Sequence, residues 1–516
     1  MAEADARARV LVLGAGVAGL AAALALRPMP VTLITPGPVR AGGSTAWAQG
    51  GIAAALDLPD SPHQHAADTE AAGAGLCDSE VVAAVTAAAP DAIRWLATLG
   101  VCFDRTPDGT PARALEGGHG RARVLHAGGD RSGAAIRDAL LAAAAASPSI
   151  AFAPGCVPTA LLLDHTGVAG VRVRRRRGGE DLHGRAVVLA SGGYAGLFAG
   201  TTNPLGNWGG GLALAARAGA ELRDLEMVQF HPTAMALDAD PLPLASEAIR
   251  GAGARLVDES GALVMAAEPG GDLAPRDRVA AAVFRRRTAG DTVFLDTPGA
   301  LGARFADHFP SVAAQARAHG LDPATQAIPV RPAAHYTMGG VRADASGRTT
   351  LPGLWACGEV AATGLHGANR LASNSMLEGV VMARWLAEDI AGIAAPARPG
   401  RAAPAAADAE TGMAMSLAPG EVRRIMDGGV GVLRDRAGLT HAIRRLSDLR
   451  QSAGAPAEVA LMVAVAALQR AESRGAHQRA DAPHMASAPG KAHALTRADA
   501  LDTAAVLAGT DTPEAA

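Results

Sequence analysis

Cysteine and aromatic residues are scarce in this sequence. Four of the 516 residues are cysteine, and no two of them form the Cys-x-x-Cys pair that would hold zinc or an iron–sulfur cluster, so no metal site is expected. Scattered cysteines are typical of a reducing compartment, and we expect a cytoplasmic protein. Because 3% of the residues are aromatic while 49% are hydrophobic, the core must consist mainly of Ala, Val and Leu.

The sequence also lacks an excess of charge of one sign. Lys and Arg number 47 against 50 Asp and Glu, which leaves a net charge of -3. This balance provides no general attraction for nucleic acid or anionic lipid, so neither is expected as a partner. The apolar stretch at residues 10–26 is interrupted by three glycines, and a strand followed by a helix explains it better than a membrane segment.

A glycine-rich turn, Gly14-Ala15-Gly16-Val17-Ala18-Gly19, is the first informative motif. It follows a strand expected at residues 9–13 and begins a helix expected at 17–26, and a second strand is expected at 31–35. This order places backbone N–H groups and the positive end of a helix where they can bind a pyrophosphate. We therefore predict cofactor contacts at Gly14, Gly16, Val17, Ala18 and Gly19. The second strand ends without the acidic residue that commonly binds ribose hydroxyls in this arrangement.

The length predicts roughly two to four domains. Blocks rich in Gly and small residues at 190–211 and 339–379 flank a segment of different composition. We expect a discontinuous domain of residues 1–224 and 339–394, into which a capping domain of residues 225–338 is inserted. Residues 395–410 are rich in Ala, Pro and Arg and predict an extended linker. Residues 411–516 predict a small helical domain, with helices at 421–426, 440–452 and 456–474, which we expect to buttress the first domain.

Three further motifs occur in order: Gly-Gly-Ser-Thr-Ala-Trp-Ala-Gln-Gly-Gly at 42–51, Leu-Trp-Ala-Cys-Gly-Glu at 354–359 and Ser-Asn-Ser-Met at 373–376. Together with the glycine-rich turn they resemble the flavin-binding segments of the succinate dehydrogenase and fumarate reductase flavoprotein superfamily. The resemblance extends over roughly residues 8–485. It implies an α/β FAD-binding Rossmann-like domain with an inserted α+β capping domain and a C-terminal helical domain.

The resemblance also implies which residues contact FAD. Besides the glycine-rich turn, these are Ser44, Thr45, Gln49, Gly50, Gly51, Glu359, Asn374, Ser375 and Met376. Respiratory members of the superfamily attach the flavin covalently to a histidine, and this sequence has Ser44 at that position. Because a hydroxyl does not replace the imidazole nucleophile, we expect noncovalent FAD.

Four short segments carry imidazole and guanidinium groups that a small dicarboxylate would need, at residues 229–233, 274–277, 335–340 and 366–370. By resemblance, the substrate carboxylates are bound by His231, Thr233, His335 and Arg370. An arginine can form a bidentate, charge-assisted pair with a carboxylate that a lysine cannot reproduce.

Arg276 resembles the arginine that donates or accepts a proton in the superfamily. Its expected place on the capping domain would bring it over the substrate when the cap closes. Glu247 and Arg250 resemble its acidic and basic neighbours on a proton path. A purely structural Glu247–Arg250 ion pair is the alternative.

Substrate choice is indicated by Glu116, in the segment Leu115-Glu116-Gly117-Gly118-His119. The segment resembles a loop of the aspartate-oxidising members, whereas succinate-oxidising relatives lack this acid. Its carboxylate could bind the ammonium that distinguishes aspartate from succinate. A solvent-exposed loop glutamate with no such role is the alternative.

The resemblance implies oxidation of L-aspartate to iminosuccinate, with hydride transfer to flavin N5 and reoxidation by oxygen or fumarate. The product would enter quinolinate formation and NAD biosynthesis, with quinolinate synthase as an expected partner. Two other hypotheses remain open: a soluble fumarate reductase or succinate dehydrogenase flavoprotein, which would not need Glu116, and a noncatalytic flavin-binding scaffold.

Overall fold

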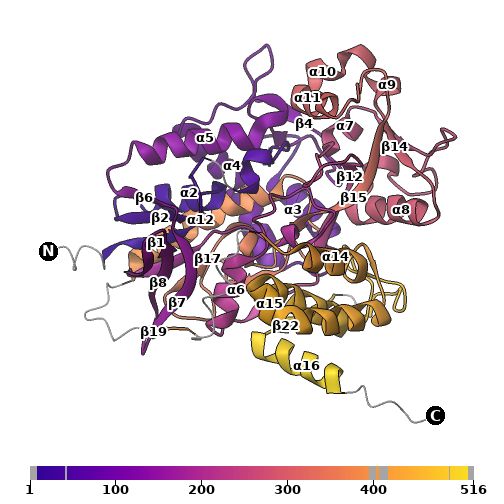
Figure 1. Ribbon diagram of the computed structural model, residues 1–516. Helices are drawn as coiled ribbons and strands as arrows, with labels where there is room; N and C mark the ends of the chain where they lie inside the picture. Colours follow the sequence, from indigo (N-terminus) through magenta and orange to yellow (C-terminus); the bar gives the residue numbers. More distant parts are fainter. Residues whose placement is uncertain (1–7, 41–42, 394–402, 406–416, 487–488, 510–516) are drawn as a thin grey trace, which may run out of the picture.

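A five-stranded parallel sheet forms the centre of the protein in the computed structural model, which describes residues 8–40, 43–393, 403–405, 417–486 and 489–509 (Figure 1). The strand order is β17-β10-β1-β2-β6, and all neighbouring strands are parallel. The bounds are β1 Val10–Leu13, β2 Val31–Thr35, β6 Ile150–Pro154, β10 Ala186–Leu189 and β17 Leu354–Ala356. Helix α2 (Val17–Ala25) connects β1 to β2, so the predicted strand–turn–helix–strand opening is confirmed.

The apolar residues of β1 alternate between two covered faces. Val10 and Val12 pack with the helices on one side, while Leu11 and Leu13 pack with an antiparallel sheet on the other. Both faces of the sheet are therefore shielded from water at β1, which explains why this strand is a continuous apolar run. The helices are α2, α4 (Ser79–Thr98), α5 (Ser132–Ala145) and α12 (Asn374–Gly392), and the antiparallel strands are β7 (Val157–Asp164), β8 (Gly167–Arg175) and β9 (Gly178–His183).

Smaller elements complete this domain. They are α3 (Pro62–Ala72), α6 (Gly210–Arg217), β3 (Ile52–Ala53), β4 (Arg113–Ala114), β5 (Val124–Leu125), β11 (Leu222–Arg223), β16 (Gly340–Arg342), β18 (Ala361–Ala362), and the short 3₁₀ turns η1 (Ser44–Trp47), η2 (Gly129–Arg131), η3 (Ala195–Leu197) and η6 (Gly358–Val360).

The inserted segment forms an antiparallel sheet of order β12-β15-β14-β13 covered by short helices. Its elements are β12 (Val228–Met235), α7 (Glu247–Gly251), β13 (Arg255–Val257), η4 (Gly271–Leu273), α8 (Arg276–Thr288), β14 (Val293–Asp296), α9 (Thr297–Ala300), η5 (Gly302–Arg304), α10 (Phe305–His308), α11 (Pro310–Ala318) and β15 (Ile328–Thr337). It has a hydrophobic cluster of its own, which includes Ile249, Val283 and Phe305. The α+β character expected of the capping domain is confirmed.

The C-terminal region is mainly helical, with α14 (Gly420–Gly429), α15 (Arg436–Gln469) and α16 (Arg497–Gly509), and short strands β20 (Leu433–Arg434), β21 (Gln478–Arg479) and β22 (Ala494–Leu495). Gly454, with φ 59°, interrupts α15 just before Pro456. The helix predicted at 456–474 is wrong at its end, because α15 stops at Gln469 and the next residues form buried ion pairs instead. The predicted linker 395–410 lies mostly outside the described residues, but Ala403–Pro404 within it forms strand β19, which pairs with β7.

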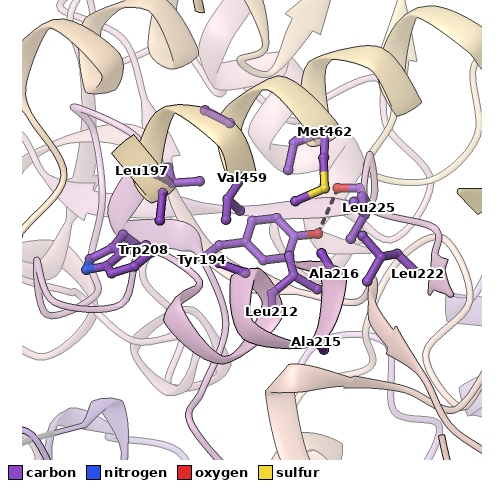
Figure 2. Close-up of a cluster of buried hydrophobic side chains, with 14 of the residues drawn as sticks. Tyr194, Leu197, Trp208, Leu212, Ala215, Ala216, Leu222, Leu225, Val459 and Met462 are labelled. Carbon is purple, nitrogen blue, oxygen red and sulfur yellow. Dashed lines mark hydrogen bonds between the residues drawn. The ribbon is translucent and has the colours of Figure 1, made fainter. Parts of the chain in front are cut away.

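Helix α15 packs against the first domain through Tyr194 (Figure 2). The tyrosine ring lies between Val459 and Met462 of α15 and Leu212 of α6, and its hydroxyl donates to the carbonyl of Leu225 at 2.7 Å. This contact places an aromatic body in the apolar core and satisfies its polar end.

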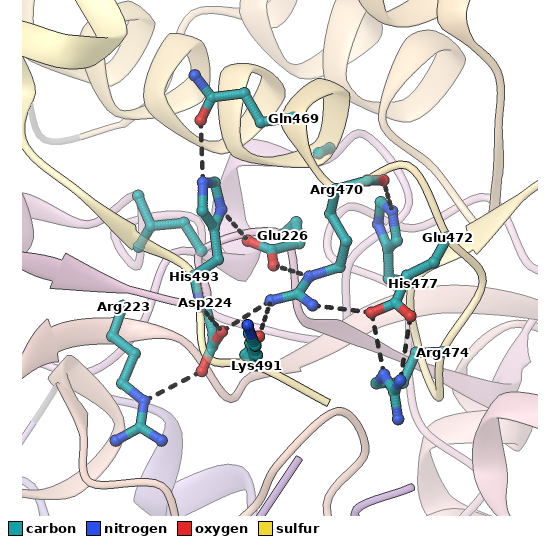
Figure 3. A network of polar contacts seen from close by, with 12 residues as sticks. Arg223, Asp224, Glu226, Gln469, Arg470, Glu472, Arg474, His477, Lys491 and His493 are labelled. Carbon is teal, nitrogen blue, oxygen red and sulfur yellow. Dashed lines mark hydrogen bonds and ion pairs between the residues drawn. The ribbon is translucent and has the colours of Figure 1, made fainter. Parts of the chain in front are cut away.

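Arg470 anchors the segment that follows α15 (Figure 3). Its guanidinium contacts Asp224 at 3.1 Å, Glu226, and Glu472 at 2.9 Å. Glu472 also accepts from Arg474. These buried charges are paired across the junction, so separating the C-terminal region from the rest would leave them uncompensated.

Within the described ranges, two helices, α4 and α15, are long and apolar enough to cross a membrane by length and composition. The apolar window of α15 is 78% buried inside the protein and that of α4 is 44% buried. Core helices of folded domains pass the same test, and the apolar side chains of both helices belong to the hydrophobic clusters described above.

Candidate functional site

A cavity of about 1080 Å³ lies between the Rossmann-like domain and the capping domain. Ligand pockets commonly measure about 300–1,000 Å³, so this one has room for a large cofactor together with a small substrate. Most of the sequence-predicted residues line it: Gly14, Gly16, Val17, Ala18, Ser44, Thr45, Gln49, Gly50, Gly51, Glu116, His231, Glu247, Arg276, His335, Glu359, Arg370, Ser375 and Met376. Gly19, Thr233, Arg250 and Asn374 are not among the lining residues.

The glycine-rich turn between β1 and α2 forms one end of the cavity. Gly14 has φ +119°, and a Cβ there would lie 2.2 Å from the carbonyl oxygen of Ala190. A Cβ at Gly19 would lie 2.0 Å from the carbonyl oxygen of Gly14, which explains this glycine's role in packing rather than in lining the cavity. The N-terminus of α2 has no side-chain cap, and the Val17 N–H donates to the Thr45 hydroxyl at 3.1 Å. The remaining N–H groups of this turn and the helix dipole suit a pyrophosphate.

Four buried polar atoms of residues that line the cavity make no hydrogen bond within the described part of the chain: Gln49 Oε1, Asp130 Oδ1, Ser191 Oγ and Glu247 Oε1. The other end of the Gln49 amide donates to the carbonyl of Leu244 at 2.9 Å, so the amide is held in place. Buried polar groups are nearly always hydrogen-bonded in folded proteins. The unpartnered atoms therefore fit a polar cofactor, and the residues present fit FAD.

Ser44 is held by two asparagines that sequence reasoning missed. Its hydroxyl donates to Asn203 Oδ1 at 2.9 Å and accepts from Asn207 Nδ2 at 2.6 Å. Both asparagines line the cavity. They are about 160 residues away in the chain, at separations of 159 and 163, so only the fold could bring them to Ser44.

Glu359 follows β17 and opens on the cavity. One carboxylate oxygen accepts from the backbone N–H of Thr337 at 3.0 Å and from its hydroxyl at 3.3 Å. Burial raises the pKa of Glu359 to about 7, despite these hydrogen bonds. The carboxyl can thus either donate or accept a hydrogen bond near neutral pH.

The residues at the start of α12 point in different directions. Asn374 turns away from the cavity, donating to the Thr69 hydroxyl at 3.0 Å and contacting His65 Nε2 at 2.8 Å. Ser375 lines the cavity and accepts from Arg370 Nη1 at 3.0 Å. Ser373, which sequence reasoning did not assign, has φ 62° and also lines the cavity.

His231 and His335 lie on neighbouring strands, β12 and β15, with ring centroids 5.0 Å apart. Burial lowers the pKa of both imidazoles well below the usual range, and the charge of Arg276 lowers both further. Both rings are therefore neutral at pH 7. Thr233 contacts His231 Nδ1 at 3.3 Å and donates to the carbonyl of Ala245 at 2.7 Å, so its place is beside the histidine rather than at the cavity wall.

Arg276 begins α8 and forms a buried ion pair with Glu247, the first residue of α7. Arg276 Nε donates to Glu247 Oε2 at 2.7 Å, and Arg250 Nη2 lies 3.3 Å from Glu247 Oε1. Burial raises the pKa of Glu247, but the two arginines hold it below its ordinary value. Burial lowers the pKa of Arg250. The chain of three charged groups runs from the cavity into the capping domain.

Gln229 joins the two cavity arginines, although sequence reasoning gave it no role. Its Oε1 accepts from Arg276 Nη1 at 3.1 Å and from Arg370 Nε at 3.3 Å. Arg370 also lies over the Tyr336 ring, 4.7 Å from the centroid. Burial and the neighbouring Arg276 lower the pKa of Arg370 to about 10, so it remains charged at pH 7.

Glu116 is buried and faces the same cavity from the opposite domain. Its Oε2 accepts from the Ser373 hydroxyl at 2.8 Å, and its Oε1 lies 3.8 Å from His126 Nε2. The alternative of a solvent-exposed loop glutamate is therefore wrong. Two arginines and two neutral imidazoles suit carboxylates, and a separate buried carboxylate suits a cation on the same molecule.

Comparisons with known proteins agree with this geometry. The family model of the FAD binding domain matches residues 9–376, and the model named "Fumarate reductase flavoprotein C-term" matches residues 454–508. Among curated proteins, the chain is 48% identical to the L-aspartate oxidase of Agrobacterium fabrum over 477 residues, covering 91% of this chain and 90% of the relative. It is 46% identical to the L-aspartate oxidase of Caulobacter vibrioides, covering 92% and 93%.

Solved structures of similar fold include a fumarate reductase chain and an Sdh1 chain. FrdA of E. coli quinol fumarate reductase has a TM-score of 0.84 at 28% identity, covering 95% of this chain and 96% of that one. Mycobacterium smegmatis Sdh1 has a TM-score of 0.79 at 32% identity, covering 93% and 90%. The similarity extends over all three parts of the fold, including the C-terminal helices.

Proposed function

Because the chain belongs to the L-aspartate oxidase family, within the succinate dehydrogenase and fumarate reductase flavoproteins, we propose that it oxidises L-aspartate to iminosuccinate. FAD is its cofactor, and when bound it supplies the acceptor for the two electrons that leave C2 of the substrate. The observation that carries the substrate assignment is the buried Glu116 carboxylate, which lines the same cavity as the arginine–histidine cluster.

Arg370, His231 and His335 bind the two substrate carboxylates in this proposal. Arg370 is charged, and its hydrogen bonds to Gln229 and Ser375 orient its guanidinium group. This group can therefore bind a substrate carboxylate without first reorienting. The neutral imidazoles contribute hydrogen bonds without adding positive charge. Glu116 binds the substrate ammonium, with Ser373 fixing one of its oxygens. The substrate is thereby held at both ends and at its nitrogen.

Arg276 moves the proton in this proposal, and Glu247 and Arg250 continue the path into the capping domain. The contacts of 2.7 Å and 3.3 Å along this chain support it, since they provide exchangeable N–H protons in sequence. Because Arg276 belongs to the capping domain, closure of this domain would complete the proton path. Closure would also exclude water from the cavity. A purely structural role of the Glu247–Arg250 pair remains the alternative to be tested.

Oxygen or fumarate reoxidises the reduced enzyme. Fumarate carries the same pair of carboxylates as the substrate, so the same arginine–histidine cluster suits it. FAD is bound noncovalently, because position 44 is a serine whose hydroxyl is engaged with Asn203 and Asn207. The enzyme acts in the cytoplasm, in NAD biosynthesis, and passes iminosuccinate to quinolinate synthase.

Anaerobic mixing of the FAD-loaded protein with L-aspartate, and separately with succinate, tests the proposal. Loss of oxidised-flavin absorbance with aspartate but not with succinate is the expected result. Faster bleaching by succinate would instead favour a soluble fumarate reductase or succinate dehydrogenase, a candidate that the fold similarity to FrdA supports. Bleaching by neither would favour a noncatalytic flavin-binding scaffold.

A further inference from the structure

A second cavity, of about 220 Å³, lies at the opposite end of α8 from Arg276, where the capping domain meets α14. Figure 1 shows α8 on the side of the capping domain that faces the C-terminal helices. Arg287 near the end of α8, Arg331 of β15 and Asp427 of α14 line the cavity, together with the rings of Phe230 and Phe284. Its volume is far above the about 15 Å³ that a single water molecule needs.

The charges in this cavity do not balance. Arg331 Nη2 lies 3.5 Å from Asp427 Oδ2, and the other Asp427 oxygen already accepts from the Gly200 N–H at 3.1 Å. Arg287 has no carboxylate within ion-pair distance in the described part of the chain, and Asp427 is the only acid among the lining residues. Two positive charges therefore face one negative charge in a partly enclosed space.

Half-burial makes this arrangement costly without a further anion. Burial lowers the pKa of Arg287, and the charge of Arg331 lowers it further. Each guanidinium presents several N–H donors in a planar fork, which matches the oxygens of a phosphate or a carboxylate. Phe230 and Phe284 give the cavity apolar walls, beside which electrostatic contacts are stronger than in bulk water.

We propose that this cavity binds a small oxyanion, inorganic phosphate or a short carboxylate, between Arg287 and Arg331. The bound anion would bridge α8 and β15 of the capping domain next to Asp427 of α14. It would thus tie α8 to β15 within the capping domain, at the far end of the helix that carries Arg276. This site is separate from the substrate cavity and does not depend on the proposed substrate.

The test uses the FAD-loaded protein without added dicarboxylate, because succinate would compete with phosphate at the proposed site. The Arg287 and Arg285 variants separate this site from the substrate cavity. Phosphate is titrated at constant ionic strength, with chloride as the balancing anion, and binding is measured by calorimetry and by the melting temperature. Arg287→Gln is compared with Arg285→Gln, since Arg285 is exposed on the same helix but does not line the cavity. Wild type and Arg285→Gln should bind phosphate with the same Kd, and Arg287→Gln at least tenfold more weakly.

Asp427→Asn should change the phosphate affinity in the opposite direction from Arg287→Gln. It removes the competing negative charge, so phosphate should bind more tightly than to wild type even if Arg287→Gln folds poorly. Titration with acetate distinguishes a carboxylate site from a phosphate site. Equal phosphate affinity in the Arg287 and Arg285 variants, or no tightening in Asp427→Asn, would overturn the proposal.

Discussion

At the scale of single residues, Arg276 is the side chain on which the proposed chemistry most depends. It contacts Glu247 and Gln229 but lies in the capping domain, away from the glycine-rich turn that receives the pyrophosphate. Arg276→Leu should therefore lower kcat at least 100-fold while FAD remains bound, since a positioned proton-transfer group contributes about 10²–10⁴-fold. Steady-state kinetics together with the flavin-to-protein absorbance ratio measure both effects. Retention of wild-type kcat would exclude the assigned proton role.

Glu116 is the residue that should separate aspartate from its analogues. Glu116→Gln removes the charge that faces the substrate ammonium, and hydrogen bonds to charged groups contribute about 1.5–3 kcal/mol. The expected loss in kcat/KM for aspartate is about 10- to 100-fold. Fumarate has no ammonium, so its reduction by the reduced variant should change little. Equal losses with aspartate and fumarate would mean that Glu116 supports the cavity rather than the substrate nitrogen.

At the scale of elements, the turn from β1 to α2 depends on the absence of a side chain. Gly14→Ala would force φ +119° on an alanine and place its Cβ 2.2 Å from the Ala190 carbonyl oxygen. The turn would shift and FAD should bind at least tenfold more weakly, as measured by fluorescence titration of the apoprotein. Gly428→Ala is the matched control, because it lies in α14 with nothing within 4 Å of the added Cβ. A Gly14 variant with wild-type FAD affinity would contradict this account of the turn.

At the scale of the whole molecule, buried histidines link folding to pH. His477 Nδ1 accepts from Arg434 Nη1 at 2.7 Å, which leaves Nε2 to donate to the carbonyl of Arg470 at 3.0 Å. Burial and the Arg434 charge lower the pKa of His477 to about 3, against 6.5 for a free histidine. Between these pH values, His477 binds a proton in the unfolded chain but stays neutral in the folded protein. Stability is therefore lost as the pH falls through this window, by up to about 1.4 kcal/mol per pH unit.

His477→Gln removes the imidazole that titrates. The free energy of unfolding should therefore depend less on pH. The free energy of unfolding of wild type and variant is measured from pH 7 to pH 4. The test compares how steeply this free energy changes with pH, not its absolute value. The variant should show a shallower decline on acidification, even though the loss of the Arg434 contact lowers its stability at pH 7. Parallel slopes would show that His477 does not titrate on unfolding.

Elements with strong local patterns could be predicted from the sequence alone. Alternating or continuous apolar runs and the glycine-rich turn predicted β1, α2 and β2, because strand and helix periodicity and the φ preferences of glycine are local properties. It also indicated the motif residues that gather at one cavity, through the order of several motifs. The end of α15 was predicted wrongly, because Arg470 leaves the helix to meet Asp224 and Glu226, which are distant in the chain.

Which side chains face one another became clear from the packing of the folded chain. It turned Asn374 toward Thr69, placed Asn203 beside Ser44, and set Gln229 between two arginines from different domains. It also left Arg287 and Arg331 together in a cavity that no motif marks. These pairings depend on where whole elements pack, and packing is governed by the total buried surface and the balance of buried charge, which no short segment of sequence contains.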